Sequence, residues 1–377
     1  TLCFYLMSLP REIICVRPIG FLNGSIAQNM SDSGMAVLLA GGPIAFLYVE
    51  LIFREENGLF AKSIYSIKDL KNKTINLSDV NLYSVFDVLE NLSQPKQLCS
   101  GSKLKRFEDK PIVMGVINVT PDSFSGSAIS YNTESAISCA LELYNSGADI
   151  IDVGGESTRP GASSVTVEEE IQRVLPVVDA LVEAGIPVSI DTRNSKVMNR
   201  AIAAGVSLVN DVSAFTHDPN SLAVIADSDV GVIVMHMQGT PETMQIAPQY
   251  NNGVVIDIYD YLSNRITACM EFGVTRDRVC VDPGIGFGKT LAHNMELISN
   301  LAVFHGLGCA LGIGLSRKSF VQAIAGEISP KDRIGGSLAS MLFAIDQGTN
   351  LVRVHDVKET VQAVSVWKEI NTFEVDR

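Results

Sequence analysis

The stretch Asp149–Asp191 reads DIIDVGGESTRPGASSVTVEEEIQRVLPVVDALVEAGIPVSID. It begins and ends with a short apolar run, and Val165–Gly185 between the two runs has the spacing of an amphipathic helix. Thr166 and Glu169 stand at the spacing of a capping box at the start of that helix. Its apolar face is formed by Ile171, Val174, Leu175, Val178, Leu181 and Val182. Two short strands joined by a helix lie parallel, so the stretch predicts a β-α-β unit.

The same pattern recurs through residues 111–377. Short runs rich in Val and Ile, each followed by Gly, Asp, Ser or Asn, occur at Ile112–Ile117, Asp149–Val153, Pro187–Ile190, Ser207–Val209, Gly231–Met235, Arg278–Val281, Cys309–Ile313 and Asn350–Val354. Eight strand-helix units match a (β/α)8 barrel, whereas an open doubly wound sheet usually has fewer strands. The sequence therefore predicts an α/β protein built around a (β/α)8 TIM barrel.

Composition limits the function. The chain has 377 residues, of which 46% are hydrophobic and 19% charged, as in a globular protein of one or two domains. Its formal net charge of −13 excludes a broad basic surface for nucleic acid, because phosphate neutralisation needs clustered Lys and Arg. Any anion-binding site must therefore be local.

Two units with different charge are predicted. Residues 1–110 hold 12 Lys and Arg against 11 Asp and Glu, which leaves 17 against 31 for residues 111–377. The polar stretch Ser93–Asp109 has the composition of a linker, and we place the boundary near residue 105. Residues 106–377 are then the barrel domain. Residues 1–105 are a small α+β extension of unknown function, with strands expected at 13–18, 36–40 and 44–53 and a helix at 82–92.

Cysteine usage and hydropathy predict a cytoplasmic protein. The seven cysteines are odd in number and form no C-x-x-C pair, which fits free thiols in a reducing compartment. The apolar stretch Leu2–Leu9 is short and lacks a preceding basic region, so it makes a poor signal peptide. Gly34–Phe53 is long enough to span a membrane, but Gly41-Gly42-Pro43 interrupts it. We expect a buried strand-turn-strand there, and no membrane partner.

Polar residues follow the predicted strands, where active sites of this fold lie. In chain order they are Asn118, Gly155, Glu156, Asp191, Asn210, Asp211, His236, Asp282, Ser316, Arg317, Lys318, His355 and Asp356. Asp191, Asn210, Asp211 and Asp282 offer groups that can pair with one edge of a flat heterocycle, as a carboxylate pairs with arginine. Each of them alone is also explained as a cap or turn residue. As a set they predict a ligand site.

Cations form a second set in this acidic domain. Arg159, Arg317, Lys318 and Arg353 stand near strand ends, and His355 lies on the same side of its strand as Arg353. They indicate an anionic substrate group such as a phosphate or pyrophosphate. Asn118 is then a candidate oxygen ligand for Mg²⁺, which takes few protein ligands when phosphates complete its shell. The alternative for Arg317 and Arg353 is a structural ion pair.

The sequence disfavours a P-loop nucleotide site and a zinc site. The stretch Asp282–Thr290, DPGIGFGKT, fails the P-loop pattern because Pro283 stands where Gly is required. His236, with Met235 and Met237 beside it, has no second His or Cys at ligand spacing, so we interpret it as packing or lining rather than as a zinc ligand.

The loops at 118–131 and 154–164 have the composition of mobile lids.

Eight motifs together resemble the dihydropteroate synthase family. They are MGVINVTPDSFS at 114–125, GADIIDVGGESTRPGA at 147–162, SIDT at 189–192, NDVSAF at 210–215, MHMQG at 235–239, DPGIGFGK at 282–289, GLSRKSF at 314–320 and RVHDVKE at 353–359. The resemblance implies a (β/α)8 barrel, a homodimer, and a role in folate biosynthesis. The implied reaction joins p-aminobenzoate to 6-hydroxymethyl-7,8-dihydropterin diphosphate and releases pyrophosphate, with Mg²⁺ as cofactor.

The resemblance also implies residue roles. The pterin is held by Asp191, Asn210, Asp282 and Lys318, with Met235 and Phe287 beside the ring and Gly314 in the same substrate site. The diphosphate and Mg²⁺ are met by Asn118, Arg353 and His355, and p-aminobenzoate by Thr158, Arg159 and Ser316. In the implied mechanism pyrophosphate departs first and the amine attacks a pterin cation, with Asp191, Lys318, Arg353 and His355 as the catalytic set. One departure is Gly126-Ser127-Ala128, where the family commonly has Asp-Gly-Gly.

Two rival functions share the barrel. A pterin-dependent methyltransferase of the corrinoid type needs the Asp and Asn pterin contacts but no diphosphate site. A non-catalytic pterin-binding module is supported only by the unexplained extension. The SRK, R-x-H and NVTPDSF motifs favour the synthase.

Overall fold

The computed structural model describes residues 12–54, 60–72, 82–98, 110–120, 133–156, 165–241 and 243–372. It divides into two compact units. The first comprises the chain up to Pro95, the segment Ala302–Gly308 and the chain from Ile370, and the second comprises Lys96–Leu301 and Cys309–Glu369. The boundary predicted near residue 105 falls in 99–109, outside the described residues, and stays a prediction.

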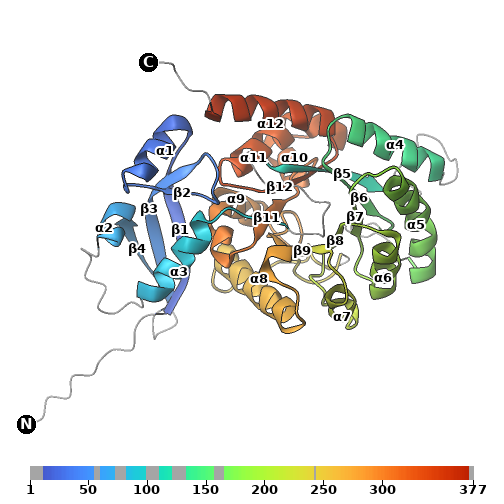
Figure 1. Ribbon diagram of the computed structural model, residues 1–377, viewed down its shortest axis with the longest axis horizontal. Coiled ribbons are helices and arrows are strands. Elements are labelled where there is room, and N and C mark those ends of the chain that lie inside the picture. The colour runs from blue at the N-terminus through green and yellow to red at the C-terminus, as the bar shows by residue number, and fades with distance from the viewer. Residues whose placement is uncertain are drawn as a thin grey trace, which may run out of the picture. The chain divides into compact units, whose positions relative to one another are not determined.

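The second unit is a closed barrel of eight parallel strands, which confirms the predicted fold (Figure 1). Each strand pairs with its neighbours in sequence, and the last pairs with the first to close the ring. The strands are β5 (Ile112–Asn118), β6 (Ile150–Gly154), β7 (Val188–Asp191), β8 (Leu208–Asp211), β9 (Gly231–Met235), β10 (Val279–Asp282), β11 (Ala310–Ile313) and β12 (Leu351–Val354). All eight predicted runs form a strand, within about two residues of the expected bounds.

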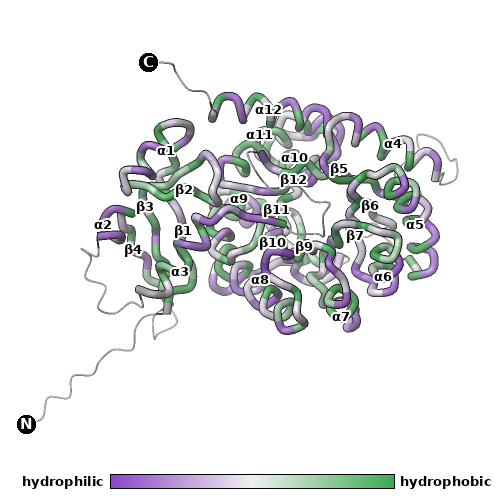
Figure 2. The backbone as a smooth tube through the Cα atoms, in the orientation of Figure 1, coloured by the Kyte–Doolittle hydropathy of each residue, from purple (hydrophilic) through white to green (hydrophobic). Residues whose placement is uncertain are grey.

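Helices follow the strands around the barrel. They are α4 (Thr133–Asn145), α5 (Val167–Glu183), α6 (Ser195–Ala204), α7 (Ser221–Ala226), α8 (Val254–Glu271), α9 (Leu291–Ser299), α10 (Ser319–Ala325), α11 (Ile334–Ile345) and α12 (Val357–Thr372). Short 3-10 helices occupy Arg276–Arg278, Leu301–Leu307 and Pro330–Arg333. Figure 2 shows purple and green alternating along these helices, as expected when one face of each packs on the barrel.

Helix α5 corrects one detail of the sequence analysis. Thr166 is the N-cap, and its hydroxyl accepts a hydrogen bond from the Glu169 backbone at 3.2 Å, as predicted. The second half of the predicted capping box is wrong, because the Glu169 carboxylate accepts from Arg173 one turn later. An arginine four residues away offers the carboxylate a charged partner, which a backbone N–H does not.

An apolar layer fills the barrel at the amino-terminal ends of its strands. It consists of Ile112, Met114, Ile150, Leu208, Ile233, Cys280, Ala310 and Leu351, and Leu98 packs into the same buried cluster. Because side chains alternate along a strand, the residue two positions after each member also faces the interior, nearer the carboxyl end. The apolar layer thus provides the floor on which the next interior layer stands.

The first unit is an antiparallel sheet with three helices. Strands β1 (Glu12–Leu22), β3 (Ala45–Arg54) and β2 (Val37–Leu38) lie in that order, and β4 (Phe60–Ser66) pairs with β3. The helices are α1 (Gly24–Asp32), α2 (Ile67–Lys71) and α3 (Leu82–Ser93). The α+β class, the three predicted strands and the helix at 82–92 are confirmed. The sequence analysis missed α1, α2 and β4.

Burial explains those omissions and the outcome at Gly34–Phe53. Helix α1 buries only Ala27 fully, and β4 has no fully buried residue, so neither carries a strong apolar pattern. Gly34–Phe53 forms β2, a turn and most of β3, which is the predicted strand-turn-strand. Among the described helices, none combines the length and the apolar character needed to cross a lipid bilayer.

A turn after β10 depends on a glycine. Gly284 has φ +70°, and a Cβ there would stand 2.0 Å from the carbonyl oxygen of His236. Gly185, after α5, has a similar φ of +74° but no atom within 4 Å of the corresponding position. The two glycines share the same backbone strain on substitution and differ only in the space available.

Gly284→Ala is expected to lower the free energy of unfolding by more than about 3 kcal/mol, because the clash with backbone adds to the left-handed penalty. Gly185→Ala serves as the matched control, with an expected loss of about 1–2 kcal/mol from the left-handed backbone alone. Urea unfolding followed by circular dichroism measures both. Equal losses in the two variants would show that the His236 carbonyl moves aside at no cost.

Candidate active site

A layer of polar side chains stands directly above the apolar floor. Five members lie two residues after a floor residue on the same strand, namely Asp152, Asn210, Met235, Asp282 and Arg353 after Ile150, Leu208, Ile233, Cys280 and Leu351. The alternation of side chains along each strand therefore places these groups in the barrel interior, at the carboxyl ends of the strands.

One cavity opens at this end of the barrel. It is open to solvent, has a volume of about 460 Å³, and is lined by Val116, Asn210, Val212, Met235, Asp282, Gly284, Ile285, Phe287, Gly314, Ser316, Lys318, Arg353 and His355. Nine of these residues belong to the site set expected from the sequence, so the structure brings most of that set together. Val116, Val212, Gly284 and Ile285 were not foreseen. Their small or apolar side chains carry no chemical signal in a sequence.

The remaining expected residues fall into two groups. Asp191 lies beside the cavity, because its Oδ2 accepts a hydrogen bond from the lining residue Arg353 at 2.6 Å. Asn118 does not line the cavity, but Asn118 Oδ1 and Asp191 Oδ2 lie 3.8 and 3.6 Å from the position a Cβ would take at Gly154, so the two side chains are near each other. Thr158 and Arg159 lie outside the described residues, as do most of the two loops expected to act as lids.

Arg353 is held by two carboxylates inside the barrel. Its Nε lies 2.6 Å from Asp152 Oδ2, and its second terminal nitrogen lies 2.6 Å from Asp191 Oδ2. Burial opposes the arginine charge, but the two carboxylates outweigh burial and raise the pKa of Arg353. The ion-pair alternative considered for Arg353 is therefore present in this structure, and it occurs within the cavity rather than away from it.

Asp152 is the principal residue missed by the sequence analysis. It is fully buried, and its Oδ2 also accepts a hydrogen bond from the Asn210 amide at 3.2 Å. Its Oδ1 has no hydrogen-bond partner among the described residues. The sequence did hold a signal, because Asp152 is a charge inside an apolar run and two residues beyond Ile150. The candidate site residues were those that follow each apolar run, whereas Asp152 lies inside its run.

Asp191 has an unusual proton affinity. Burial raises the pKa of this carboxyl to about 7, Arg353 opposes the rise, and the neighbouring carboxylates Asp152, Asp211 and Glu170 add to it. Three acidic neighbours against one arginine mean that Asp191 gives up its proton less readily than a surface aspartate.

Asp282, Lys318 and Phe287 form the opposite wall. Asp282 Oδ1 accepts a hydrogen bond from the Gly284 backbone at 2.7 Å, and burial raises the pKa of its carboxyl. Burial lowers the pKa of Lys318 to about 8, although Asp282 opposes that shift. The Lys318 ammonium lies 4.2 Å from the centre of the Phe287 ring, a cation-π distance. This wall offers a carboxylate, an ammonium and a flat apolar ring side by side.

The turn that carries Phe287 is held by a buried lysine. Lys289 donates to the Phe287 carbonyl at 2.9 Å, and its Nζ lies 3.0 Å from His236 Nδ1. Burial and this ammonium lower the pKa of His236 to about 2, so the imidazole is neutral and accepts from the lysine. His236 does not line the cavity and packs against Tyr250 and Tyr261, which agrees with its interpretation as a packing residue.

Arg317 does not take the anion-binding position considered for it. Its guanidinium pairs with Asp356, with Nε 3.1 Å from Asp356 Oδ2, and it does not line the cavity. The structural ion-pair alternative is therefore confirmed for this residue. Its backbone is left-handed, with φ +59°, and its N–H donates to Ser337 Oγ at 2.9 Å. This strained residue directs its neighbours Ser316 and Lys318 toward the cavity.

Asp211 likewise has a structural role. It is fully buried, and its carboxylate accepts from the backbone and hydroxyl of Ser213 at 2.7 and 2.6 Å and from the Phe215 backbone at 2.9 Å. These bonds close the turn after β8, and Asp211 does not line the cavity. The turn-residue alternative is correct for Asp211.

Ser316 and His355 form a hydrogen-bonded pair at the cavity wall. Ser316 Oγ lies 3.1 Å from His355 Nδ1 and accepts a hydrogen bond from the His355 backbone at 3.2 Å. Burial, Arg353 and Arg317 lower the pKa of His355 to about 3. The imidazole is therefore neutral at physiological pH, between cations that oppose its protonation.

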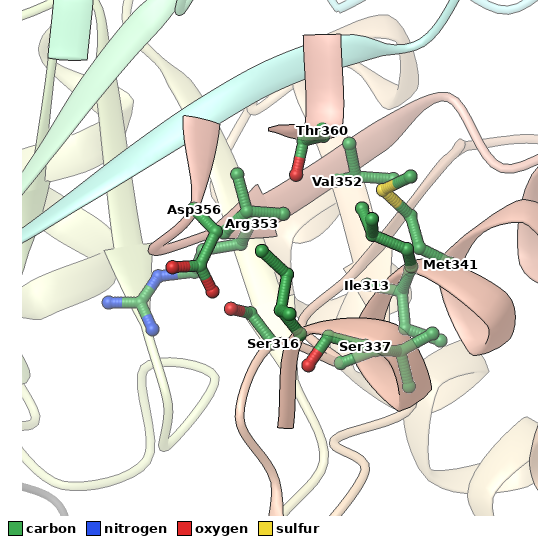
Figure 3. A pocket seen from close by; sticks show the side chains of 12 residues that line it. Ile313, Ser316, Ser337, Met341, Val352, Arg353, Asp356 and Thr360 are labelled. Carbon is green, nitrogen blue, oxygen red and sulfur yellow. The ribbon is translucent and has the colours of Figure 1, made fainter. Parts of the chain in front are cut away.

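A second, apolar crevice of about 310 Å³ lies behind β11 and β12, against α11 and the start of α12 (Figure 3). The labelled apolar side chains are Ile313, Met341 and Val352. In Figure 3 the Arg353 guanidinium extends away from these side chains. The described polar residues of the crevice, Ser316, Ser337, Asp356 and Thr360, include no basic side chain directed into it, whereas the first cavity combines acidic and basic groups as an active site does.

The cavity combines hydrogen-bond acceptors, two cations and a neutral imidazole. None of its lining residues is a cysteine, and Ser316 supplies its one hydroxyl group. Among the described residues, no group of three or more His, Cys, Asp or Glu side chains is arranged to hold a metal ion. Such a site suits a flat, polar heterocycle with an attached anionic group, in a reaction that needs no protein nucleophile.

Comparison with known proteins agrees with this geometry. Residues 114–355 match the family described as pterin binding enzyme. The dihydropteroate synthase of Escherichia coli strain K12 is 43% identical over 257 residues, which covers 68% of this chain and 90% of that protein. The enzyme of Neisseria meningitidis serogroup B is 43% identical over 274 residues, covering 70% of this chain and 95% of the relative.

Solved structures give the same result. Xanthomonas albilineans dihydropteroate synthase with 4-aminobenzoic acid superposes with a TM-score of 0.68 at 40% identity, covering 73% of this chain and 98% of that one. The Burkholderia cenocepacia enzyme complexed with 7,8-dihydropteroate gives a TM-score of 0.65 at 39% identity, with 73% and 96% covered. With its closed barrel and this constellation at the carboxyl ends of the strands, the chain belongs to the dihydropteroate synthase family of pterin-binding enzymes.

Proposed function

We propose that this chain joins 6-hydroxymethyl-7,8-dihydropterin diphosphate to p-aminobenzoate, giving 7,8-dihydropteroate and pyrophosphate. The observation that carries the proposal is the single cavity that holds both acceptors for a heterocycle edge and cations for a diphosphate. The relatives support it, because one of them is solved with 4-aminobenzoic acid and another with 7,8-dihydropteroate.

The pterin binds against the wall formed by Asp282, Asn210 and Lys318. A carboxylate and an amide match the amino and ring-nitrogen groups of a pterin edge, because each can form parallel hydrogen bonds with it. Phe287 and Met235 flank the flat ring, and Gly314 leaves room for it. Ser316, with Thr158 and Arg159, lies near the p-aminobenzoate subsite.

The reaction proceeds by ionisation. The C–O bond to the diphosphate breaks with its electron pair leaving on pyrophosphate, and the aryl amine then forms the C–N bond and loses a proton. Arg353 and His355 stabilise the charge that develops on the leaving group. The negative charge of ionised Asp191 stabilises the pterin cation. Because the amine is itself the nucleophile, no side chain of the cavity needs to attack the substrate.

The site offers one protein oxygen ligand for Mg²⁺. Asn118 Oδ1 is a neutral oxygen beside Asp191 at the end of β5, and a Mg²⁺ ion carried by a diphosphate needs few protein ligands. Asn118 would hold such an ion. When bound, the ion would neutralise charge on the departing diphosphate.

The wider organisation is also part of the proposal. Residues 106–377 are the catalytic domain, residues 1–105 are an extension without an assigned function, and the enzyme acts as a homodimer in the cytoplasm. The free thiols of all five described cysteines support a reducing compartment.

Asp282→Asn and Lys318→Met are each expected to lower kcat/KM for the pterin diphosphate by about 100-fold or more, because each removes a charged hydrogen-bonding group facing the pterin. The measurement follows pyrophosphate and dihydropteroate with and without p-aminobenzoate, and circular dichroism checks folding. Lys331→Ala, which changes an exposed lysine outside the cavity, is the matched control. Near-normal turnover in either cavity variant would refute its assignment.

The pH dependence follows from two shifted groups. Asp191, with its pKa raised to about 7, is ionised above that pH, and Lys318, with its pKa lowered to about 8, is charged below it. Both charged forms are needed, so kcat/KM is expected to peak between about pH 7 and pH 8. Lys318→Arg keeps its charge far above pH 8, so any activity it retains should lack the alkaline decline. An unchanged alkaline decline in that variant would assign it to another group.

Asn118→Ala is expected to raise the Mg²⁺ concentration for half-maximal activity about 10-fold, because it removes the protein's oxygen ligand and leaves only the substrate's. Asn118→Asp, which keeps an oxygen and adds charge, should keep that concentration at or below the wild-type value. A Mg²⁺ titration of initial rates measures both. The same half-maximal concentration in Asn118→Ala and wild type would remove Asn118 from the metal site.

A further inference from the structure

We infer that Ser316 fixes the ring proton of His355 on Nε2, so that this imidazole presents a neutral Nε2–H donor to the ligand in the cavity. Ser316 is then a positioning residue, acting through His355. The inference rests on the proposed function for the identity of that ligand, a diphosphate, but the position of the proton is a property of the free protein.

The geometry places the two side chains in contact. His355 follows Arg353 by two residues at the end of β12, and both His355 and Ser316 line the cavity. Ser316 Oγ lies 3.1 Å from His355 Nδ1, a hydrogen-bonding distance, so one of these two atoms must carry the shared hydrogen.

Counting donors and acceptors decides which atom carries it. Ser316 Oγ already accepts the backbone N–H of His355 at 3.2 Å, and a serine hydroxyl has one hydrogen to donate. If Nδ1 carried the ring proton and donated to Oγ, the hydroxyl hydrogen would find no acceptor among the described residues. If the hydroxyl donates to Nδ1, the hydroxyl hydrogen and Nδ1 satisfy each other, and the ring proton resides on Nε2, free for a ligand.

The surrounding charges keep the ring neutral, which the argument requires. Burial opposes a positive charge on His355, as do Arg353 two residues earlier and Arg317 and Lys318 from the segment after β11, whereas Asp356 favours it. A doubly protonated ring would also lose the acceptor at Nδ1 that the hydroxyl uses. The imidazole is therefore a neutral donor in the free protein.

Ser316 is rigid enough to impose this choice. The next residue, Arg317, has a left-handed backbone fixed by two bonds: its N–H donates to Ser337 Oγ at 2.9 Å and its carbonyl accepts from Arg333 at 3.0 Å. A hydroxyl on so restrained a backbone holds the imidazole in one orientation. The site gains a donor toward an anion without adding a charge that Arg353 and Lys318 would repel.

The direct test is ¹⁵N nuclear magnetic resonance of histidine-labelled protein near pH 7.5 without ligand. The chain has five histidines, so long-range proton-nitrogen correlations of each ring can be resolved, and His355→Gln identifies the signals of His355. The expected pattern is an unprotonated Nδ1 and a protonated Nε2. A protonated Nδ1 in the wild type would overturn the inference.

Substitutions separate this role from a structural one. Ser316→Ala should shift His355 toward a mixture of both tautomers, whereas Ser316→Thr, which keeps a hydroxyl, should retain the Nε2–H form. Ser340→Ala, which removes a helix hydroxyl bonded to Gly336, is the control and should leave the His355 spectrum unchanged. An unchanged spectrum in Ser316→Ala would show that another group sets the tautomer.

Activity provides an independent readout that does not depend on the folding of Ser316→Ala. A glutamine amide nitrogen matches the position of Nε2 and an asparagine amide nitrogen that of Nδ1. His355→Gln is therefore expected to retain at least ten-fold more kcat/KM than His355→Asn, and equal losses would contradict the inference. If the spectra are as expected and the wild-type protein forms no dihydropteroate, the proposed function fails while the pairing of Ser316 and His355 stands.

Discussion

The bridge from Arg353 to Asp152 and Asp191 is the interaction on which the rest of the site depends. It links β12 to β6 and β7 across the interior of the barrel, directly above an apolar floor. In such surroundings a charge is tolerated only when it is paired, and removal of one partner from a buried pair costs about 3–5 kcal/mol. The positions of the guanidinium and of the Asn210 amide follow from this pairing, and Arg353 limits the rise that burial causes in the pKa of Asp191.

The bridge also sets the overall charge that a ligand meets. It leaves the Arg353 charge paired with Asp152 and Asp191, while Lys318 and Asp282 are the other basic and acidic side chains among the described lining residues. His355 adds nothing because it is neutral. Carboxylates beside the paired Arg353 in a poorly solvated site favour a positively charged intermediate and disfavour retention of a detached anion. The same balance therefore assists both the breaking of the C–O bond and the departure of pyrophosphate.

Much of this architecture was predictable from the sequence because local and global requirements coincide. A strand buried on both sides needs a short apolar run, and eight such runs with helices between them specify a barrel and the end at which polar groups gather. What the sequence did not decide were choices between partners that are distant along the chain. Nothing in the sequence distinguishes Arg317 from Arg353. In the structure Asp356 binds Arg317 outside the cavity, and Asp152 binds Arg353 within it. Asp152 itself was hidden because it interrupts an apolar run.

The apolar floor has a consequence for the traffic of molecules through the barrel. Leu98 and interior residues of seven of the eight strands pack together at the amino-terminal end, so the described part of the barrel leaves access from the carboxyl ends of the strands. Groups bound against Asn210 and Asp282 lie next to the floor, whereas Ser316 and His355 stand nearer the entrance. Whatever occupies the deep position must arrive first and leave last. The order in which molecules bind and leave is therefore set by how deep in the barrel each one lies, rather than by its relative affinity.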